Sequence, residues 1–170
     1  AGQLLLQMDT EATLGETLNL SESIAFKQEQ LQLKLQEKQI TLDQLTSELD
    51  VLKRNIILQK EVEERLIFLE KQGAGSEIQS LQQSDKVQQV EGELARIQGE
   101  RLKQTKQLDQ QIRMLRSELG QLRSRLIEQK VSMRYKVIKA PVDGIVFDLK
   151  PKSPGFVAQN SEPVMKIVTF

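Results

Sequence analysis

The sequence predicts a mainly helical protein: a long antiparallel, two-stranded coiled-coil hairpin inserted into a small β-domain. Three observations predict this fold. Apolar residues recur at alternating spacings of four and three over two long stretches, as in a coiled coil. A glycine-containing break separates the two stretches once, at residues 73–76. Finally, all four prolines and many Val, Ile and Phe residues lie in the strand-like segment 135–170.

The amino-acid composition argues against several classes of protein function. The 170 residues carry 24 basic and 24 acidic side chains, and this neutral balance argues against a nucleic-acid-binding protein. The absence of Cys excludes disulfides and thiolate metal sites. The absence of His removes the commonest general base and the commonest metal ligand. We therefore expect a protein that is not an enzyme and that uses no metal and no cofactor.

No apolar run approaches the ~20 residues of a membrane-spanning helix. The chain opens in the middle of a strand-like pattern, "AGQLLLQMD", which we interpret as the start of a fragment. We therefore expect any targeting signal or membrane anchor to lie outside this segment.

The first helix is predicted by a seam that begins at Ile24, in which eight of ten positions are apolar. Its members are Ile24, Gln28, Leu31, Leu35, Lys38, Leu42, Leu45, Leu49, Leu52 and Ile56. A phase slip is then expected, to a seam of Leu58, Val62, Leu66 and Leu69. No Pro or Gly interrupts the chain between residues 16 and 72, so the helix is expected to continue throughout.

The second helix has the same kind of seam. Its apolar members are Val87, Val90, Leu94, Ile97, Leu108, Ile112, Leu115, Leu119, Leu122 and Leu126. Charge weakly favours pairing of the two helices. Residues 9–72 carry 13 acidic and 8 basic side chains, a net charge of −5, and residues 76–133 carry 8 acidic and 10 basic ones, a net charge of +2.

The break lies in "ERLIFLEKQGAGSEIQ", residues 64–79. Gly73 suits the left-handed residue that ends a helix, and Ser76 followed by Gln79 suits a capping box that begins the next one. So short a loop requires an antiparallel return. The expected arms are about 10–72 and 76–133, each about 60 residues or ~90 Å long. Folding about residue 74 would set Leu42 near Leu108 and Ile24 near Leu126.

The remaining segments are expected to be strands. The predicted strands are Leu4–Met8, Val137–Lys139, Ile145–Leu149 and Val164–Val168, with turns at Asp143-Gly144 and Pro154-Gly155. Because the arms are nearly equal in length, the first strand should arrive beside the second. The expected division is residues 1–9 (a strand), 10–134 (the hairpin, with its tip at 73–76) and 135–170 (β-strands).

Here a resemblance becomes specific. The segments "IKAPVDGIV" and "PGFVAQNSEPVMKIV" resemble the second half of a lipoyl-like or biotinyl-like domain, and "AGQLLLQMD" resembles the end of the first half. A split, incomplete lipoyl-like domain interrupted by a long α-hairpin is similar to the periplasmic adaptors, or membrane fusion proteins, of Gram-negative tripartite export systems. The resemblance covers the whole chain. The long arms resemble the hemolysin D-like members, which are linked to ABC transporters.

The resemblance implies a role for the tip. In that family an Arg, a Leu four residues later and a Ser seven residues beyond dock on a TolC-like outer-membrane channel. Arg65, Leu69 and Ser76 match these spacings, and Gly73 and Gly75 would let another backbone approach closely. The implied protein is periplasmic, anchored to the inner membrane, and forms a ring, hexameric in the family. It would join an inner-membrane transporter to the channel in type I secretion.

Other interpretations stay open. Arg65 could be a solvated helix residue, Leu69 a seam residue and Ser76 only a helix cap. The protein could instead serve a drug-efflux pump, act as a coiled-coil chaperone or tether of the prefoldin kind, or carry a biotinyl or lipoyl group on Lys166, although that lysine falls inside an expected strand. A basic run near the hairpin base could contact neighbouring subunits: Arg113, Arg116, Arg123 and Arg125.

Overall fold

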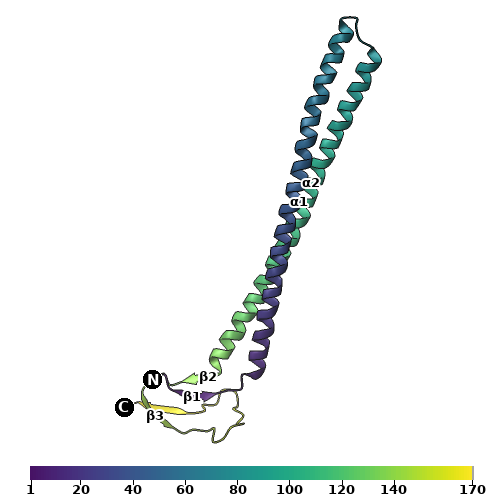
Figure 1. The fold of residues 1–170 in the computed structure, drawn as a ribbon. Coiled ribbons are helices and arrows are strands. Elements are labelled where there is room, and N and C mark those ends of the chain that lie inside the picture. Colours follow the sequence, from purple (N-terminus) through teal and green to yellow (C-terminus); the bar gives the residue numbers. More distant parts are fainter. Residues whose placement is uncertain (170) are drawn as a thin grey trace. The chain divides into compact units, whose positions relative to one another are not determined.

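A computed structural model describes residues 1–169 and confirms the mainly helical hairpin (Figure 1). In chain order the elements are β1 (Leu4–Gln7), α1 (Glu11–Lys71), α2 (Glu77–Tyr135), β2 (Val137–Lys139), β3 (Gly144–Phe147) and β4 (Lys166–Thr169). The chain divides into two compact units, residues 23–122 and residues 1–22 with 123–170. Within the described residues, no helix is long and apolar enough to cross a membrane.

The unit of residues 23–122 is held by a narrow seam between α1 and α2. Its centre is a cluster of Leu45, Leu49 and Ile97, with Leu52 and Leu94 packed against it. The remaining buried apolar residues continue the seam in both directions: Ile24, Ile56, Val87, Leu108, Ile112 and Leu119. All of them occupy predicted seam positions, because residues spaced by four and three lie on one face of a helix.

The predicted phase slip after Ile56 is wrong. Partly buried positions continue in the original register through Gln59, Glu63, Leu66 and Glu70, whereas Leu58, Val62 and Leu69 are exposed. Polar residues can occupy these positions because they bond across the seam. The Gln83 side-chain amide donates to the Gln59 carbonyl at 2.9 Å and to its side-chain oxygen at 2.8 Å, and the Ser84 hydroxyl donates to the Glu63 carboxylate.

The register also differs near the start of the predicted seam. Gln28 and Leu35 are exposed, and Lys27 and Lys34 take the partly buried positions instead. A lysine can do so because its aliphatic stem covers apolar surface while its ammonium group reaches a partner. Lys27 pairs with Glu118 on the opposite helix.

Ion pairs across the seam agree with antiparallel arms that fold near residue 74. The Lys38 ammonium nitrogen lies 2.6 Å from a carboxylate oxygen of Asp109. The Lys60 ammonium nitrogen likewise lies 2.6 Å from a carboxylate oxygen of Glu91. These pairs are largely exposed to solvent, so each contributes little to stability and serves mainly to define the register.

In the other unit, β1 pairs with β2 in antiparallel fashion, as predicted. The Cα partners are Leu4 with Lys139, Leu6 with Ile138 and Gln7 with Val137, with an irregularity between Leu4 and Leu6. The Met8 amide extends the pairing by donating to the Lys136 carbonyl at 2.8 Å. Just beyond, Asp9 caps α1, since its carboxylate accepts from the Glu11 amide at 3.0 Å.

A second antiparallel ribbon joins β3 to β4, with Ile145 opposite Val168 and Phe147 opposite Lys166. The predicted tight turn at Asp143-Gly144 is wrong, because Gly144 is the first residue of β3, and β2 and β3 belong to different sheets. Gly144 is required by close packing, since a Cβ there would lie 2.3 Å from the Val168 carbonyl oxygen. Gly155, in the predicted turn with Pro154, has a positive φ of 88°.

The seam predicts a sharp contrast between two leucines of α1. Leu49 is 4% exposed and Leu35 is 41% exposed. Leu49→Ala should lower the free energy of unfolding by about 2–4 kcal/mol, because it leaves a cavity in the seam. Leu35→Ala should lower it by less than about 1 kcal/mol. Urea unfolding followed by circular dichroism measures both, and equal losses would contradict the observed register.

Candidate functional site: the tip of the hairpin

The tip begins where α1 ends in a Schellman turn. The Ala74 amide donates to the Leu69 carbonyl at 3.0 Å, and the Gly73 amide donates to the Glu70 carbonyl at 3.0 Å. Gly73 has a φ of 73°, the left-handed conformation that this motif requires and that glycine adopts without a Cβ penalty. These bonds satisfy carbonyl groups at the end of the helix and reverse the chain abruptly.

Gly75 brings the loop close to the end of α1. A Cβ on Gly75 would lie 2.8 Å from the Glu70 backbone nitrogen and 3.1 Å from the Leu69 carbonyl carbon, so any larger residue would displace the backbone. Ser76 then stands just before α2, and its carbonyl accepts from the Ser80 amide at 3.2 Å. The expected capping box does not form: among residues 1–169, no hydrogen bond joins the Ser76 hydroxyl to the Gln79 amide.

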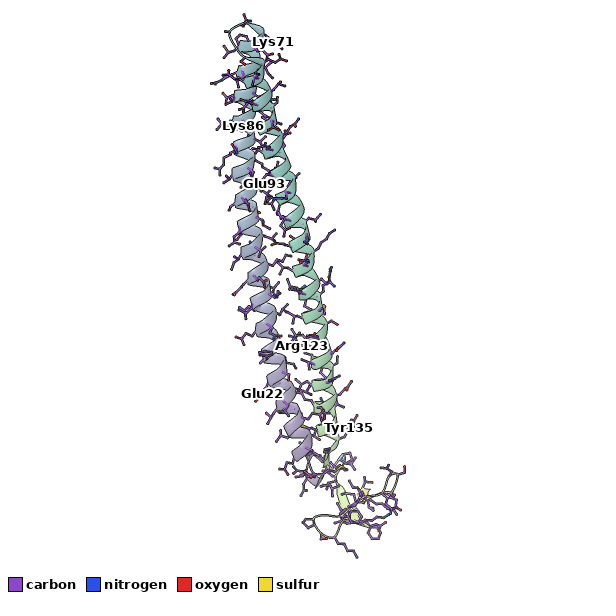
Figure 2. All side chains as sticks on the ribbon, turned by 90° about the vertical axis from the view of Figure 1, so that its right-hand side faces the viewer. Glu22, Lys71, Lys86, Glu93, Arg123 and Tyr135 are labelled. Carbon is purple, nitrogen blue, oxygen red and sulfur yellow. The ribbon has the colours of Figure 1, made fainter. Side chains whose placement is uncertain are left out.

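Beside this turn, the outer face of α1 forms a shallow recess lined by Glu64, Arg65, Phe68 and Leu69. Phe68 is 62% exposed and Leu69 is 43% exposed, so the floor of the recess is apolar and open to solvent. The Arg65 guanidinium forms an ion pair with the carboxylate of Glu61, which lies one helical turn earlier in α1; the nitrogen and oxygen atoms are 2.6 Å apart. Figure 2 shows the side chains that project outward around this end of the hairpin, near Lys71.

Behind the recess, the seam between the helices is polar. Ser80 and Gln83 are buried on α2, and the Ser80 hydroxyl has no partner among the described residues. Lys60 bridges to α2, and its hydrogen bond to the Glu91 carboxylate raises the pKa of the Lys60 ammonium group. Near the tip, polar residues therefore share the seam with Leu66 and Val87, while Phe68 and Leu69 are exposed on the outside.

The side chains of the tip offer several kinds of contact to a binding partner. Arg65 offers a planar set of donors that could exchange Glu61 for carbonyl or carboxylate groups of a partner. Phe68 and Leu69 offer apolar surface, and the Ser76 hydroxyl offers a donor and an acceptor. Within residues 1–169, no group of three acidic, His or Cys side chains is arranged to hold a metal ion.

The structure brings only part of the predicted site together. Arg65 and Leu69 share one recess, whereas Gly73 and Gly75 shape the adjoining turn and Ser76 begins α2. Sequence reasoning missed three exposed apolar residues of the tip, Phe68, Ile78 and Leu81, which are 62–67% exposed. Phe68 lies outside both the predicted seam and the observed one, so either register could have identified it as exposed.

The fold is a long helical hairpin that closes in a short turn, with the strand before α1 paired to the strand after α2. The chain is similar to the solved structure of the periplasmic adaptor protein EmrA, with a TM-score of 0.51 and 16% sequence identity. The match covers 99% of this chain and 66% of that one, so the chain spans slightly less than two thirds of the EmrA structure. No family model and no curated protein matches the sequence.

The turn geometry predicts how Gly73 tolerates substitution. Gly73→Ala should lower the free energy of unfolding by about 1–2 kcal/mol, because a Cβ is disfavoured at its φ of 73°. Gly73→Asn should cost less, since Asn adopts this conformation more readily. Thermal unfolding followed by circular dichroism compares the two variants. Equal stability of Gly73→Ala and the unmodified chain would show that the turn does not depend on this conformation.

Proposed function

We propose that this chain is the hairpin segment of a periplasmic adaptor that links an inner-membrane transporter to a TolC-like outer-membrane channel. The adaptor is a ring of copies held in the periplasm and anchored to the inner membrane. It contributes to export by joining two membrane proteins end to end, and it catalyses no reaction. The transporter is of the ABC type, which the arm length favours over the drug-efflux alternative.

The observation that carries the proposal is the exposed tip. Three side chains are open to solvent beside the tight glycine turn: Arg65, Phe68 and Leu69. Their outward face is not packed in the seam between α1 and α2. Exposed apolar groups next to an available cation are typical of the centre of a protein interface. The fold shared with EmrA supports the same role, because that protein is a periplasmic adaptor.

Docking at the tip follows from these side chains. Leu69 and Phe68 bind apolar surface of the channel, and Arg65 leaves Glu61 to bind carbonyl or carboxylate groups of the channel. Ser76 adds a hydrogen bond from the start of α2. Gly73 and Gly75 keep the turn thin, so that the channel's backbone approaches without meeting side chains.

The carrier alternative has no observation in its favour. Lys166 is the first residue of β4 and pairs with Asp148 at 3.4 Å, whereas a carrier lysine must lie at an exposed turn. Nor does any contact favour the chaperone alternative, in which helix ends would be free instead of joined by the short loop between Lys71 and Glu77.

Reversing the charge at the tip should abolish export. Arg65→Asp places a carboxylate beside Glu61 and Glu64 and removes the guanidinium that binds the channel, so export should fall to background. Leu69→Ala and Ser76→Asp should also abolish it. The measurement is secretion by cells that produce the whole protein, together with crosslinking from the tip to the channel and an immunoblot for protein level.

Arg96→Asp is the matched control, because it makes the same change at an exposed arginine of α2 that is likewise paired with a nearby carboxylate, that of Glu93, and that lies outside the tip. It should leave both export and the tip-to-channel crosslink unchanged. If Arg65→Asp also supports full export and crosslinking at normal protein levels, the tip is not the docking site and the proposed function loses its main support.

A further inference from the structure

Near the turn, α1 contains two sets of residues that could face α2, and the structure uses the more polar one. The polar set is the observed seam, whose members are partly buried: Gln59, Glu63, Leu66 and Glu70. The apolar set has helical spacing as well and contains only apolar residues: Leu58, Val62, Leu66 and Leu69. Apart from the shared Leu66, its members are 38–57% exposed. Burial of apolar surface alone would therefore favour the apolar set.

A rotation of α1 about its own axis relates the two sets. Leu58, Val62 and Leu69 each precede a residue of the polar set by one position, so they lie about 100° away on the helix surface. A rotation of the end of α1 by somewhat less than this angle would bury the apolar set in place of the polar one. Arg65 lies four residues before Leu69 on the same side, so the rotation would turn both of these residues of the recess toward α2.

The facing residues of α2 match the polar set. Ser80 and Gln83 are each 6% exposed, and no apolar residue of α2 is buried between the turn and Val87. The Gln83 side-chain amide donates to Gln59 twice, to its carbonyl at 2.9 Å and to its side-chain oxygen at 2.8 Å. The Gln59 side-chain amide in turn donates to the Asn55 side-chain oxygen at 3.3 Å. The buried amide of Gln83 is therefore satisfied when the polar set faces α2.

These donors would lose their partners if the apolar set faced α2. Gln83 would then meet Leu58 and Val62, whose side chains accept no hydrogen bond, and the Ser84 hydroxyl would lose the Glu63 carboxylate. An unpaired buried donor costs more free energy than its hydrogen bond contributes, so Gln83 opposes the rotation. Apolar burial and hydrogen bonding thus favour different rotations of the same helix end.

The tip has little other packing that could decide between the two rotations. Ile56 on α1 and Val87 on α2 are the last buried apolar residues before the turn, and none of the described apolar side chains between them is buried. The Ser80 hydroxyl is buried without a partner among the described residues, which is a cost of the observed arrangement. A segment with so few buried apolar contacts is locally weak, and a few hydrogen bonds can determine its arrangement.

We propose that Gln83 and Gln59 are positioning residues, whose hydrogen bonds hold the end of α1 in the rotation that directs Arg65 and Leu69 outward. Polar residues at seam positions are known to specify the register of coiled coils at a cost in stability. Here the pair specifies the rotation of one helix end, and with it the exposure of the recess. The effect on export rests on the proposed function, whereas the effect on exposure does not.

Thiol labelling tests the rotation, because the chain contains no natural cysteine. Leu69→Cys reports on the apolar set, and its neighbour Glu70→Cys reports on the polar set. Each is placed in the whole protein, produced in cells without the channel, and labelled with a maleimide. Gln83→Leu removes the donors and offers apolar surface to Leu58 and Val62. It should slow the labelling of Leu69→Cys severalfold and speed that of Glu70→Cys severalfold.

Opposite changes at adjacent positions distinguish rotation from loosening. If Gln83→Leu only loosened the tip, both cysteines would be labelled faster, and that result would overturn the proposal, as would unchanged rates. The matched control adds Gln59→Leu and Glu63→Leu to Gln83→Leu, which makes the observed seam apolar. It should restore the original labelling rate of Leu69→Cys, and a rate that stays slow would also contradict the proposal.

Export measured in the same variants separates this inference from the proposed function. Gln83→Leu should lower export and the crosslink from the tip to the channel, and the matched control should restore both. If labelling changes as expected while export continues unchanged, the positioning role of Gln83 stands and docking through Leu69 is wrong.

Discussion

The fold depends on a single constraint: two helices can bury only one narrow stripe each, and the register of that stripe decides what every other residue faces. Nine apolar residues are buried among the described residues, all of them in the unit of residues 23–122, and none of the described side chains is less than 2% exposed. Because α1 keeps one register from Leu42 to Glu70, Leu58 and Leu69 are directed outward. The exposure of the apolar residues at the tip is thus a consequence of the seam's register.

Different interactions hold the middle of the hairpin and the part next to the turn. The cluster of Leu45, Leu49 and Ile97 holds the middle with apolar packing. Toward the turn, the seam relies on Gln59 and Gln83, whose hydrogen bonds define the register but contribute little net energy. The apolar side chains of Phe68 and Leu69 are not used in the seam and stay exposed at the tip.

Much of the fold was predictable from the sequence because its determinants are local. Spacing alone identified both helices and nearly every seam residue of α2, and Gly73 identified the turn. The predicted register of α1 was wrong where polar residues occupy seam positions. The slip to Leu58 and Leu69 was expected because Gln59 and Glu63 do not look like seam residues, and only their partners Gln83 and Ser84, more than twenty residues away, make them so. The Ser76 capping box failed because motif spacing does not determine a side-chain rotamer.

The central claim is that the outward face of the tip exists to be covered by an outer-membrane channel. The most direct measurement is thiol labelling in intact cells, with a single cysteine at Leu69 or Ser76 in a chain that otherwise has none. The account predicts that both positions are labelled in cells without the channel and protected in cells with it, while a cysteine at Arg125 is labelled equally in both. Equal labelling of Leu69→Cys and Ser76→Cys with and without the channel would contradict it.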